Sequence, residues 1–231
     1  MQKIVLNFWN SILMAGLSIG LAGCGDSGDS SQTIVPPTET TYIGYLVDSN
    51  VSGVSYTDGL NSGMTGTSGG FTYSKNRTLS FSVGGVTLGD INTSNISTDN
   101  TIYPTDIVVG VDRNNTTDIK VLKMLQFIQS LDSDGNTSNG ITIDTNTRTS
   151  LSSHIFNLLD SNVSISDINT TIQLIGKNFI SQVEAQSHFI HTLKSTGIIT
   201  NSIPTITSTD TVSINENQTT VLTLIASDAD N

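Results

Sequence analysis

Apolar and polar positions alternate along residues 41–89, which is the pattern of half-buried β-strands. Gly, Asn and Asp residues that favour turns separate the alternating segments. The four segments are 42–47, 54–57, 71–74 and 79–83. We therefore predict a small antiparallel, sandwich-like β unit in this part of the chain.

Residues 90–115 are polar and irregular, and beyond them apolar residues recur at helical spacing. Thr117 or Asp118 is the expected N-cap of the first helix. The apolar positions that define three helices are Val121, Leu122, Leu125, Ile128 and Leu131; Leu151, Ile155, Leu158 and Leu159; and Ile168, Ile172, Ile175 and Phe179.

A fourth helix opens on the capping box of Ser181 and Glu184, runs towards Leu193 and stops at Gly197. Strand-type patterns return in residues 205–231. The predicted fold class is therefore α+β. An antiparallel sandwich-like unit is followed by a helical half and then by a truncated all-β repeat.

The first residues form a leader, because Lys3 precedes an apolar run that ends in Leu-Ala-Gly-Cys at residues 21–24. These four residues resemble the lipobox of bacterial lipoproteins. The resemblance implies cleavage before Cys24 and lipid attachment to it, and several acyl chains anchor a protein stably. Gly25 in place of Asp implies the outer membrane. The alternative, an uncleaved spanning helix, has about the right length but lacks a basic flank on its far side.

These patterns divide the chain into five parts. They are a signal peptide at 1–23, a lipidated flexible tether at 24–40, a β-then-α lipoprotein domain at 41–196, a linker at 197–204 and a truncated repeat at 205–231. The tether is rich in Gly, Ser and Asp and has no apolar period, so we expect it to be flexible.

Composition narrows the classes of partner. Hydrophobic residues make up 35% and charged residues 13% of the chain, and removal of the leader leaves eight cations against 20 acids. A net charge of −12 argues against nucleic acid, which requires clustered Lys and Arg, and is compatible with divalent cations. Cys24 is the only cysteine, so the chain can form neither an internal disulfide nor a multi-thiolate metal site.

The middle of the chain is similar to two kinds of module. The glycine-rich order from Gly44 to Phe71 is similar to β-sandwich repeats that resemble carboxypeptidase regulatory domains, which act in structure or binding. More widely, residues 42–194 resemble a set of uncharacterised bacterial lipoprotein domains that share three motifs. The motifs match 44–53, 125–141 and 185–193. This resemblance implies location and module type but no activity.

Asp132, Asp134 and Asn136 alternate as the first three ligands of a calcium loop do. Position twelve is Ile143 instead of Glu, so the loop is not an EF-hand. Two interpretations stay open. One is a short Asp-rich calcium turn, and the other is a metal-free loop in which Asp, Gly and Asn serve turn geometry.

The tail carries a further resemblance. Ser-Ile-Asn-Glu-Asn at 213–217 and Ala-Ser-Asp-Ala-Asp at 226–230 resemble the opening of a bacterial cadherin-like repeat, an Ig-like sandwich. The resemblance implies Glu216, Asp228 and Asp230 as calcium ligands, and carboxylates from adjacent loops suit that ion. The alternative is an ordinary strand pair that ends in an acidic loop. We interpret the end of the chain as a truncated repeat.

Other candidates are weaker. His188 and His191 lie three residues apart and Glu184 one turn earlier, but three such groups on a helix are more often surface or boundary residues than a zinc site. His154 is isolated. None of the short motifs for hydrolases, nucleotide-binding loops or zinc proteases occurs, so we do not expect an enzyme.

These observations predict a membrane-anchored extracytoplasmic lipoprotein of adhesin type, with calcium-dependent contact to a cell-surface protein, matrix or polysaccharide. The alternative is a surface or periplasmic lipoprotein that captures a glycan or a partner protein without calcium. Nucleic acid is not an expected partner of either.

Overall fold

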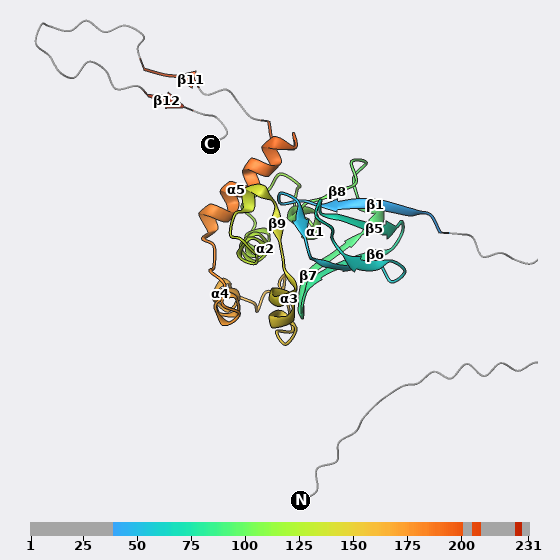
Figure 1. Ribbon diagram of the computed structural model, residues 1–231. Helices are drawn as coiled ribbons and strands as arrows, with labels where there is room; N and C mark the ends of the chain where they lie inside the picture. The colour runs from blue at the N-terminus through green and yellow to red at the C-terminus, as the bar shows by residue number, and fades with distance from the viewer. Residues whose placement is uncertain (1–38, 201–204, 209–224, 228–231) are drawn as a thin grey trace, which may run out of the picture. The chain divides into compact units, whose positions relative to one another are not determined.

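The computed structural model describes residues 39–200, 205–208 and 225–227 (Figure 1). In the first of these segments, strands follow one another and helices gather beside them, which bears out the expected α+β class. No helix in these described ranges is long and apolar enough to cross a membrane.

A three-stranded sheet has the order β5-β1-β8. Strand β1 (Thr41–Leu46) pairs antiparallel with β5 (Gly70–Ser74) and parallel with β8 (Thr101–Ile102). Residues on β1 alternate between exposed and buried, as the period-two pattern predicts. The parallel partner β8 comes from the stretch that the sequence pattern treats as irregular.

A five-stranded sheet has the order β10-β7-β6-β3-β4. Its antiparallel strands are β3 (Ser55–Thr57), β4 (Ser62–Met64), β6 (Thr78–Val83) and β7 (Val86–Asn92), and β10 (Phe156–Asn157) pairs parallel with β7. The inner faces of the two sheets meet through rings on β5 and β6. Phe71 and Phe81 pack edge to face there, with ring centroids 5.3 Å apart.

The predicted antiparallel pairing is confirmed for β1 with β5 and among β3, β4, β6 and β7, but the β unit also contains the parallel pairs of β8 and β10. A further parallel pair joins β2 (Val51–Ser52) to β9 (Ile141–Thr142). Because β9 and β10 lie among the helices in sequence, the helical half completes pairings of the strand half. Short parallel pairs of this kind leave no periodic signal in the sequence.

The helices are α1 (Pro104–Ile107), α2 (Ile119–Ser130), α3 (Thr145–Leu151), α4 (Ile165–Leu174) and α5 (Gln182–Ser195). The described residues also form single 3-10 turns at Thr93–Asn95 and Thr137–Asn139. In Figure 1, α2 lies between the strand-rich part and the helices α4 and α5. Residues from Val121 to Ser130 are all buried, as expected of a central helix.

Local capping signals set the helix starts. The Asp118 side chain accepts the N–H groups of Lys120 and Val121, and the predicted capping box of Ser181 and Glu184 is formed. The predicted first and fourth helices are thus confirmed. The third is confirmed as α4, although this helix ends before Phe179.

The predicted helix through Leu151, Ile155, Leu158 and Leu159 is wrong. Helix α3 ends at Leu151, and the chain then forms β10. Leu151 and Leu158 are fully buried, but Ile155 is 85% exposed, so the four residues do not share a buried face. The free edge of β7 supplies backbone partners for β10, and this pairing overrides the helical spacing.

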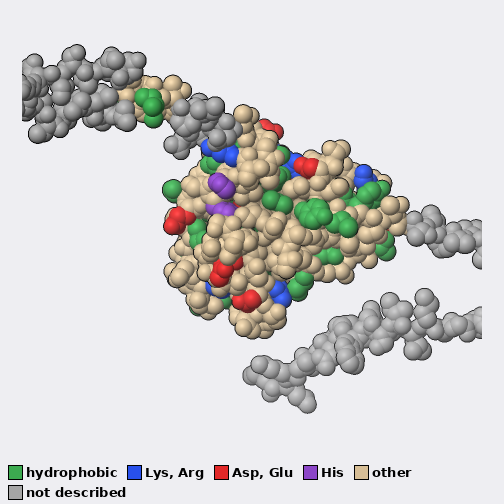
Figure 2. Space-filling model, turned by 45° about the horizontal axis from the view of Figure 1, so that its top comes forward, with side chains coloured by type: hydrophobic (Ala, Val, Ile, Leu, Met, Phe, Trp, Pro, Cys, Tyr) green, Lys and Arg blue, Asp and Glu red, His purple; other side chains and the backbone are tan. Residues whose placement is uncertain are grey.

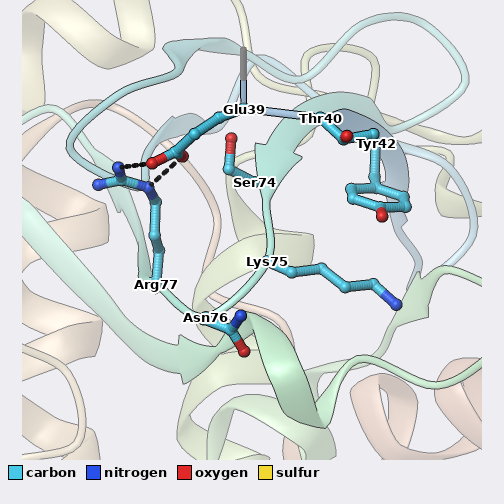
Figure 3. A pocket seen from close by; sticks show the side chains of 7 residues that line it. All are labelled: Glu39, Thr40, Tyr42, Ser74, Lys75, Asn76 and Arg77. Atoms are coloured by element: carbon cyan, nitrogen blue, oxygen red, sulfur yellow. Dashed lines mark hydrogen bonds and ion pairs between the residues drawn. The ribbon is translucent and has the colours of Figure 1, made fainter. Parts of the chain in front are cut away.

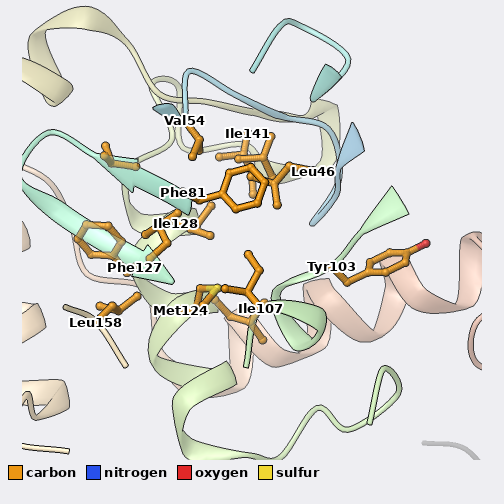
Figure 4. Packing of buried hydrophobic residues seen from close by; sticks show 14 of the residues in the cluster. Leu46, Val54, Phe81, Tyr103, Ile107, Met124, Phe127, Ile128, Ile141 and Leu158 are labelled. Atoms are coloured by element: carbon orange, nitrogen blue, oxygen red, sulfur yellow. The ribbon is translucent and has the colours of Figure 1, made fainter. Parts of the chain in front are cut away.

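One hydrophobic core spans both halves of the domain (Figure 4). Leu46 and Phe81 from the strands pack with Met124 and Phe127 of α2 and with Leu158. All five side chains have no exposed surface. Residues 41–196 therefore share one core instead of forming a separate β domain and a separate helical domain.

Gly44 and Gly53, at the two ends of the motif segment 44–53, lie where a larger side chain would not fit. A Cβ at Gly44 would lie 2.5 Å from the ring of Phe71, so this residue lets the ring cross β1. Gly53 has φ 84°, and a Cβ there would lie 2.1 Å from the carbonyl oxygen of Ile143. A side chain at either position would collide with its neighbour.

Only two short strands of the tail are described. Strand β11 (Thr205–Ile206) pairs antiparallel with β12 (Ala226–Ser227). This pair agrees with the strand-type pattern after the linker. It does not test the resemblance to a cadherin-like repeat.

Candidate functional site

An acidic loop connects α2 to β9, and the side chain of Asp132 accepts hydrogen bonds from residues at both ends of this loop. One carboxylate oxygen of this residue, Oδ1, accepts the N–H of Ser133 and the N–H of Thr142, each at 2.9 Å. Thr142 belongs to β9, so a single carboxylate joins the end of the helix to the strand. Asp132 is 4% exposed.

The rest of the loop is shaped by local side-chain hydrogen bonds. Asp134 accepts the N–H of Asn136 at 2.9 Å through Oδ1 and the side-chain amide of Asn139 at 3.0 Å through Oδ2. Asn136 accepts the hydroxyl of Ser138 at 2.6 Å. Such bonds are typical of Asp and Asn in turns, so the loop keeps its shape by means of its own residues.

The remaining oxygen of Asp132 is different. Its Oδ2 is buried and has no hydrogen-bond partner among the described residues. Burial raises the pKa of Asp132, and the neighbouring Asp134 carboxylate raises it further. The hydrogen bond from Asn139 holds the pKa of Asp134 below its usual value. A buried acceptor without a partner costs stability, and a cation beside it would remove that cost.

A pocket of about 320 Å³ lies against this loop, and Asp132, Asp134 and Lys177 are among the residues that line it. The ammonium of Lys177 donates to the main-chain oxygen of Asp132 at 2.8 Å. Two carboxylates and one ammonium therefore meet at the pocket, which leaves a local excess of negative charge. The acidic loop and this pocket are the candidate cation site.

The ligand set at this site is small. Within residues 39–200, 205–208 and 225–227, no three His, Cys, Asp or Glu side chains are grouped so that they could hold a metal ion. Asp132 and Asp134 lie together as predicted, whereas the Asn136 side-chain oxygen is used by Ser138. A calcium ion here would need main-chain or water oxygens in addition, which this ion accepts.

Four predicted site residues lie outside the described residues. They are Cys24, Glu216, Asp228 and Asp230. The predicted lipid attachment and the predicted calcium ligands of the tail therefore stay predictions.

His188 joins three segments that are far apart in sequence. Its Nε2 lies 3.1 Å from the hydroxyl of Ser49 and 3.6 Å from Oδ1 of Asp48, both in the turn after β1. Its Nδ1 lies 3.2 Å from the hydroxyl of Thr137 in the acidic loop. His191 is exposed whereas His188 is half-buried, so the two imidazoles have different surroundings.

Asp48 is the most deeply buried acid of this network, with no exposed surface. Its Oδ2 accepts the side-chain amide of Gln129 at 2.8 Å, and the same amide donates to the main-chain oxygen of Ala185 at 3.0 Å. Burial raises the pKa of Asp48 to about 7 against the lowering effect of Gln129. Burial also lowers the pKa of His188.

Sequence reasoning did not single out Asp48 or Gln129. A signal was present, because Asp48, Gln129 and His188 belong to the three motif segments 44–53, 125–141 and 185–193. Their convergence in one buried network depends on the tertiary structure.

The Ser49–His188 contact has the chemistry of a hydroxyl beside a base, but the arrangement differs from a nucleophile triad. In a triad the acid holds one ring nitrogen while the nucleophile meets the other. Here Asp48 and Ser49 meet the same nitrogen, and Thr137 meets the other. The network therefore connects the turn after β1, the acidic loop and α5.

Charge on one face of the described domain is dispersed. In Figure 2, acidic and basic side chains are scattered over the visible face of the described domain, and neither forms a broad patch.

Comparison with known proteins gives no further assignment. The chain matches no family model, and neither a curated protein nor a solved structure matches it.

Proposed function

We propose that the protein is a membrane-anchored extracytoplasmic lipoprotein of adhesin type, whose calcium-stiffened domain contacts another cell, matrix or polysaccharide. The lipobox at residues 21–24 and the polar tether after it support the anchor. The tail that resembles a cadherin-like repeat supports the adhesin layout.

The single observation that carries the calcium part of the proposal is the free Oδ2 of Asp132 beside the carboxylate of Asp134. Calcium prefers carboxylate and other oxygen ligands, and its charge would relieve the repulsion between the two acids. Since Oδ1 of Asp132 already joins α2 to β9, an ion at Oδ2 would stiffen this junction.

The test is a thermal melt of the chain from Thr33 to Asn231, in excess chelator and then in millimolar calcium. A ligand at about 100 times its dissociation constant adds about 2.7 kcal/mol, which is a Tm shift of several degrees. We expect this shift to disappear in Asp132→Asn/Asp134→Asn.

The matched control is Asp90→Asn/Asp112→Asn, which removes the same charge from two exposed positions. This control should keep the calcium shift of the parent chain. A calcium shift that is equal in the loop variant and in the control would remove the acidic loop from the proposal. A shift lost instead in Asp228→Ala/Asp230→Ala would place calcium in the tail.

A second candidate is a surface or periplasmic lipoprotein that captures a glycan or a partner protein without calcium. The observation in its favour is a polar pocket of about 530 Å³ at the start of β1, on a different part of the domain from the acidic loop. Binding that persists in chelator would favour this candidate over calcium-dependent adhesion.

A further inference from the structure

The pocket at the start of β1 is formed by two segments (Figure 3). Glu39, Thr40 and Tyr42 contribute one wall, and Ser74 at the end of β5 together with residues 75–77 in the turn to β6 contributes the other. We call it the turn pocket. It brings two cations, Lys75 and Arg77, together in a chain with few positive charges.

The wall at Ser74 is held in place by buried hydrogen bonds. The carboxylate of Asp58, which is 5% exposed, accepts the N–H of Ser74 at 2.7 Å. The side-chain amide of Asn61 donates to the hydroxyl of Ser74 at 3.0 Å. The turn itself is fixed by the main-chain N–H of Arg77, which donates to the side-chain hydroxyl of Thr93 at 2.9 Å. A pocket with fixed walls loses little entropy when a ligand binds.

Lys75 is available for a ligand. Its ammonium lies 5.0 Å from the centroid of the Tyr42 ring, and the Tyr42 ring stacks on that of Tyr73 with centroids 5.6 Å apart. Within the part of the chain that the structure describes, Lys75 has no hydrogen bond and no ion pair with a carboxylate. The ring therefore holds the ammonium at the pocket while its three donors stay free.

Arg77 binds a carboxylate of the chain itself at the turn pocket. Its guanidinium donates to the carboxylate of Glu39 through Nε at 3.1 Å and through Nη2 at 2.8 Å. The two side chains are 32% and 46% exposed, so water reaches the pair and a competing carboxylate can replace Glu39. Glu39 thus occupies the position that an acidic ligand would take.

We propose that the turn pocket binds a carboxylate-bearing polysaccharide, with Lys75 and Arg77 holding the carboxylates. Thr40, Tyr42, Ser74 and Asn76 add neutral hydroxyl and amide groups that suit sugar hydroxyls. The net charge of −11 repels polyanions from the rest of the chain, so binding must be local. This inference rests on the second candidate function above, a lipoprotein that captures a glycan without calcium, and names the class of that glycan.

The experiment measures binding of the full chain, held in detergent, to immobilised alginate, a polymer of uronic acids, with neutral dextran as the reference. Chelator is present throughout, so calcium cannot bridge acidic polymer and acidic protein. We expect saturable binding to alginate above dextran. Lys75→Met and Arg77→Gln should each raise the protein concentration at half-saturation by about tenfold, because each variant loses one charge contact with the polymer.

The matched control is Lys120→Met, which removes an exposed cation far along the chain on α2. Binding by this variant should stay within about twofold of the parent chain. Lys75 is exposed, so its variant should melt at the parent temperature, and a melt of each variant checks this.

Two results would overturn the proposal: binding to alginate no stronger than to dextran, or equal losses in the Lys75 and Lys120 variants. The calcium-dependent melt described above does not involve the turn pocket. A calcium shift without alginate binding would therefore reject this ligand class and leave the adhesin proposal standing.

Discussion

Replacing Asp48 by Asn should change how the stability of the domain depends on pH. Asp48 is completely buried, its Oδ2 accepts the amide of Gln129, and its Oδ1 lies 3.6 Å from His188. Asn has nearly the same shape. Its oxygen can still accept from Gln129, and its amide can donate towards Nε2 of His188.

The magnitude follows from the pKa of Asp48, which burial raises from 3.8 to about 7. A rise of this size corresponds to about 4 kcal/mol between the folded and unfolded states. A raised pKa means that the folded state keeps its proton longer than the unfolded state. The stability that Asp48 contributes is therefore complete below pH 3.8 and is lost as the pH rises to about 7.

The assay is urea denaturation of the parent chain and Asp48→Asn at about pH 4.5, 6 and 8. Relative to the parent, the variant should gain about 3 kcal/mol of unfolding free energy between pH 4.5 and 8, because about 1 kcal/mol of the total is already lost at pH 4.5. Asp90→Asn, at an exposed position, should show no such trend. A difference between parent and Asp48→Asn that is the same at all three values of pH would refute the reasoning.

Two further predictions concern the loop at Asp58 and the packing between the sheets. Burial raises the pKa of Asp58, but hydrogen bonds from Asn61, Ser74 and Leu60 outweigh it and lower the pKa to about 2. With a lowered pKa, its contribution is present above pH 3.8 and is lost as the pH falls through about 2. Asp58→Asn should therefore cost about 1–2 kcal/mol at pH 5, after allowance for solvent screening, and less at pH 2, as measured by denaturation at both. Phe81→Ala should cost about 3–5 kcal/mol, because it opens a cavity beneath Phe71. Ile43→Ala, at a side chain 58% exposed, should cost less than about 1 kcal/mol in the same urea titration, and equal costs would contradict the packing argument.

The candidate cation site was partly predictable. The spacing of Asp132 and Asp134 identified an acidic turn, and the structure places both carboxylates at one pocket. Sequence spacing could not show that Oδ1 of Asp132 bonds to Thr142 while Oδ2 stays without a partner, because Thr142 is ten residues away. It could not reveal the turn pocket either, whose walls come from separate strands.

The sequence by itself determined the elements whose signals are local. Alternation predicted β1, β3, β5 and β6, and the caps Asp118 and Ser181 predicted where α2 and α5 begin. These signals work because side-chain periodicity and capping bonds depend only on residues within a turn or two of one another.

The tertiary structure alone decided which distant segments of the chain pair and contact one another. It assigned residues 156–157 to β10 instead of a helix, because the edge of β7 offered hydrogen bonds there. It also brought His188 to Ser49, which is 139 residues away in sequence, and gave Asp48 its raised pKa by burying it beside Gln129. Pairing and burial depend on contacts between distant segments, and no local period encodes them.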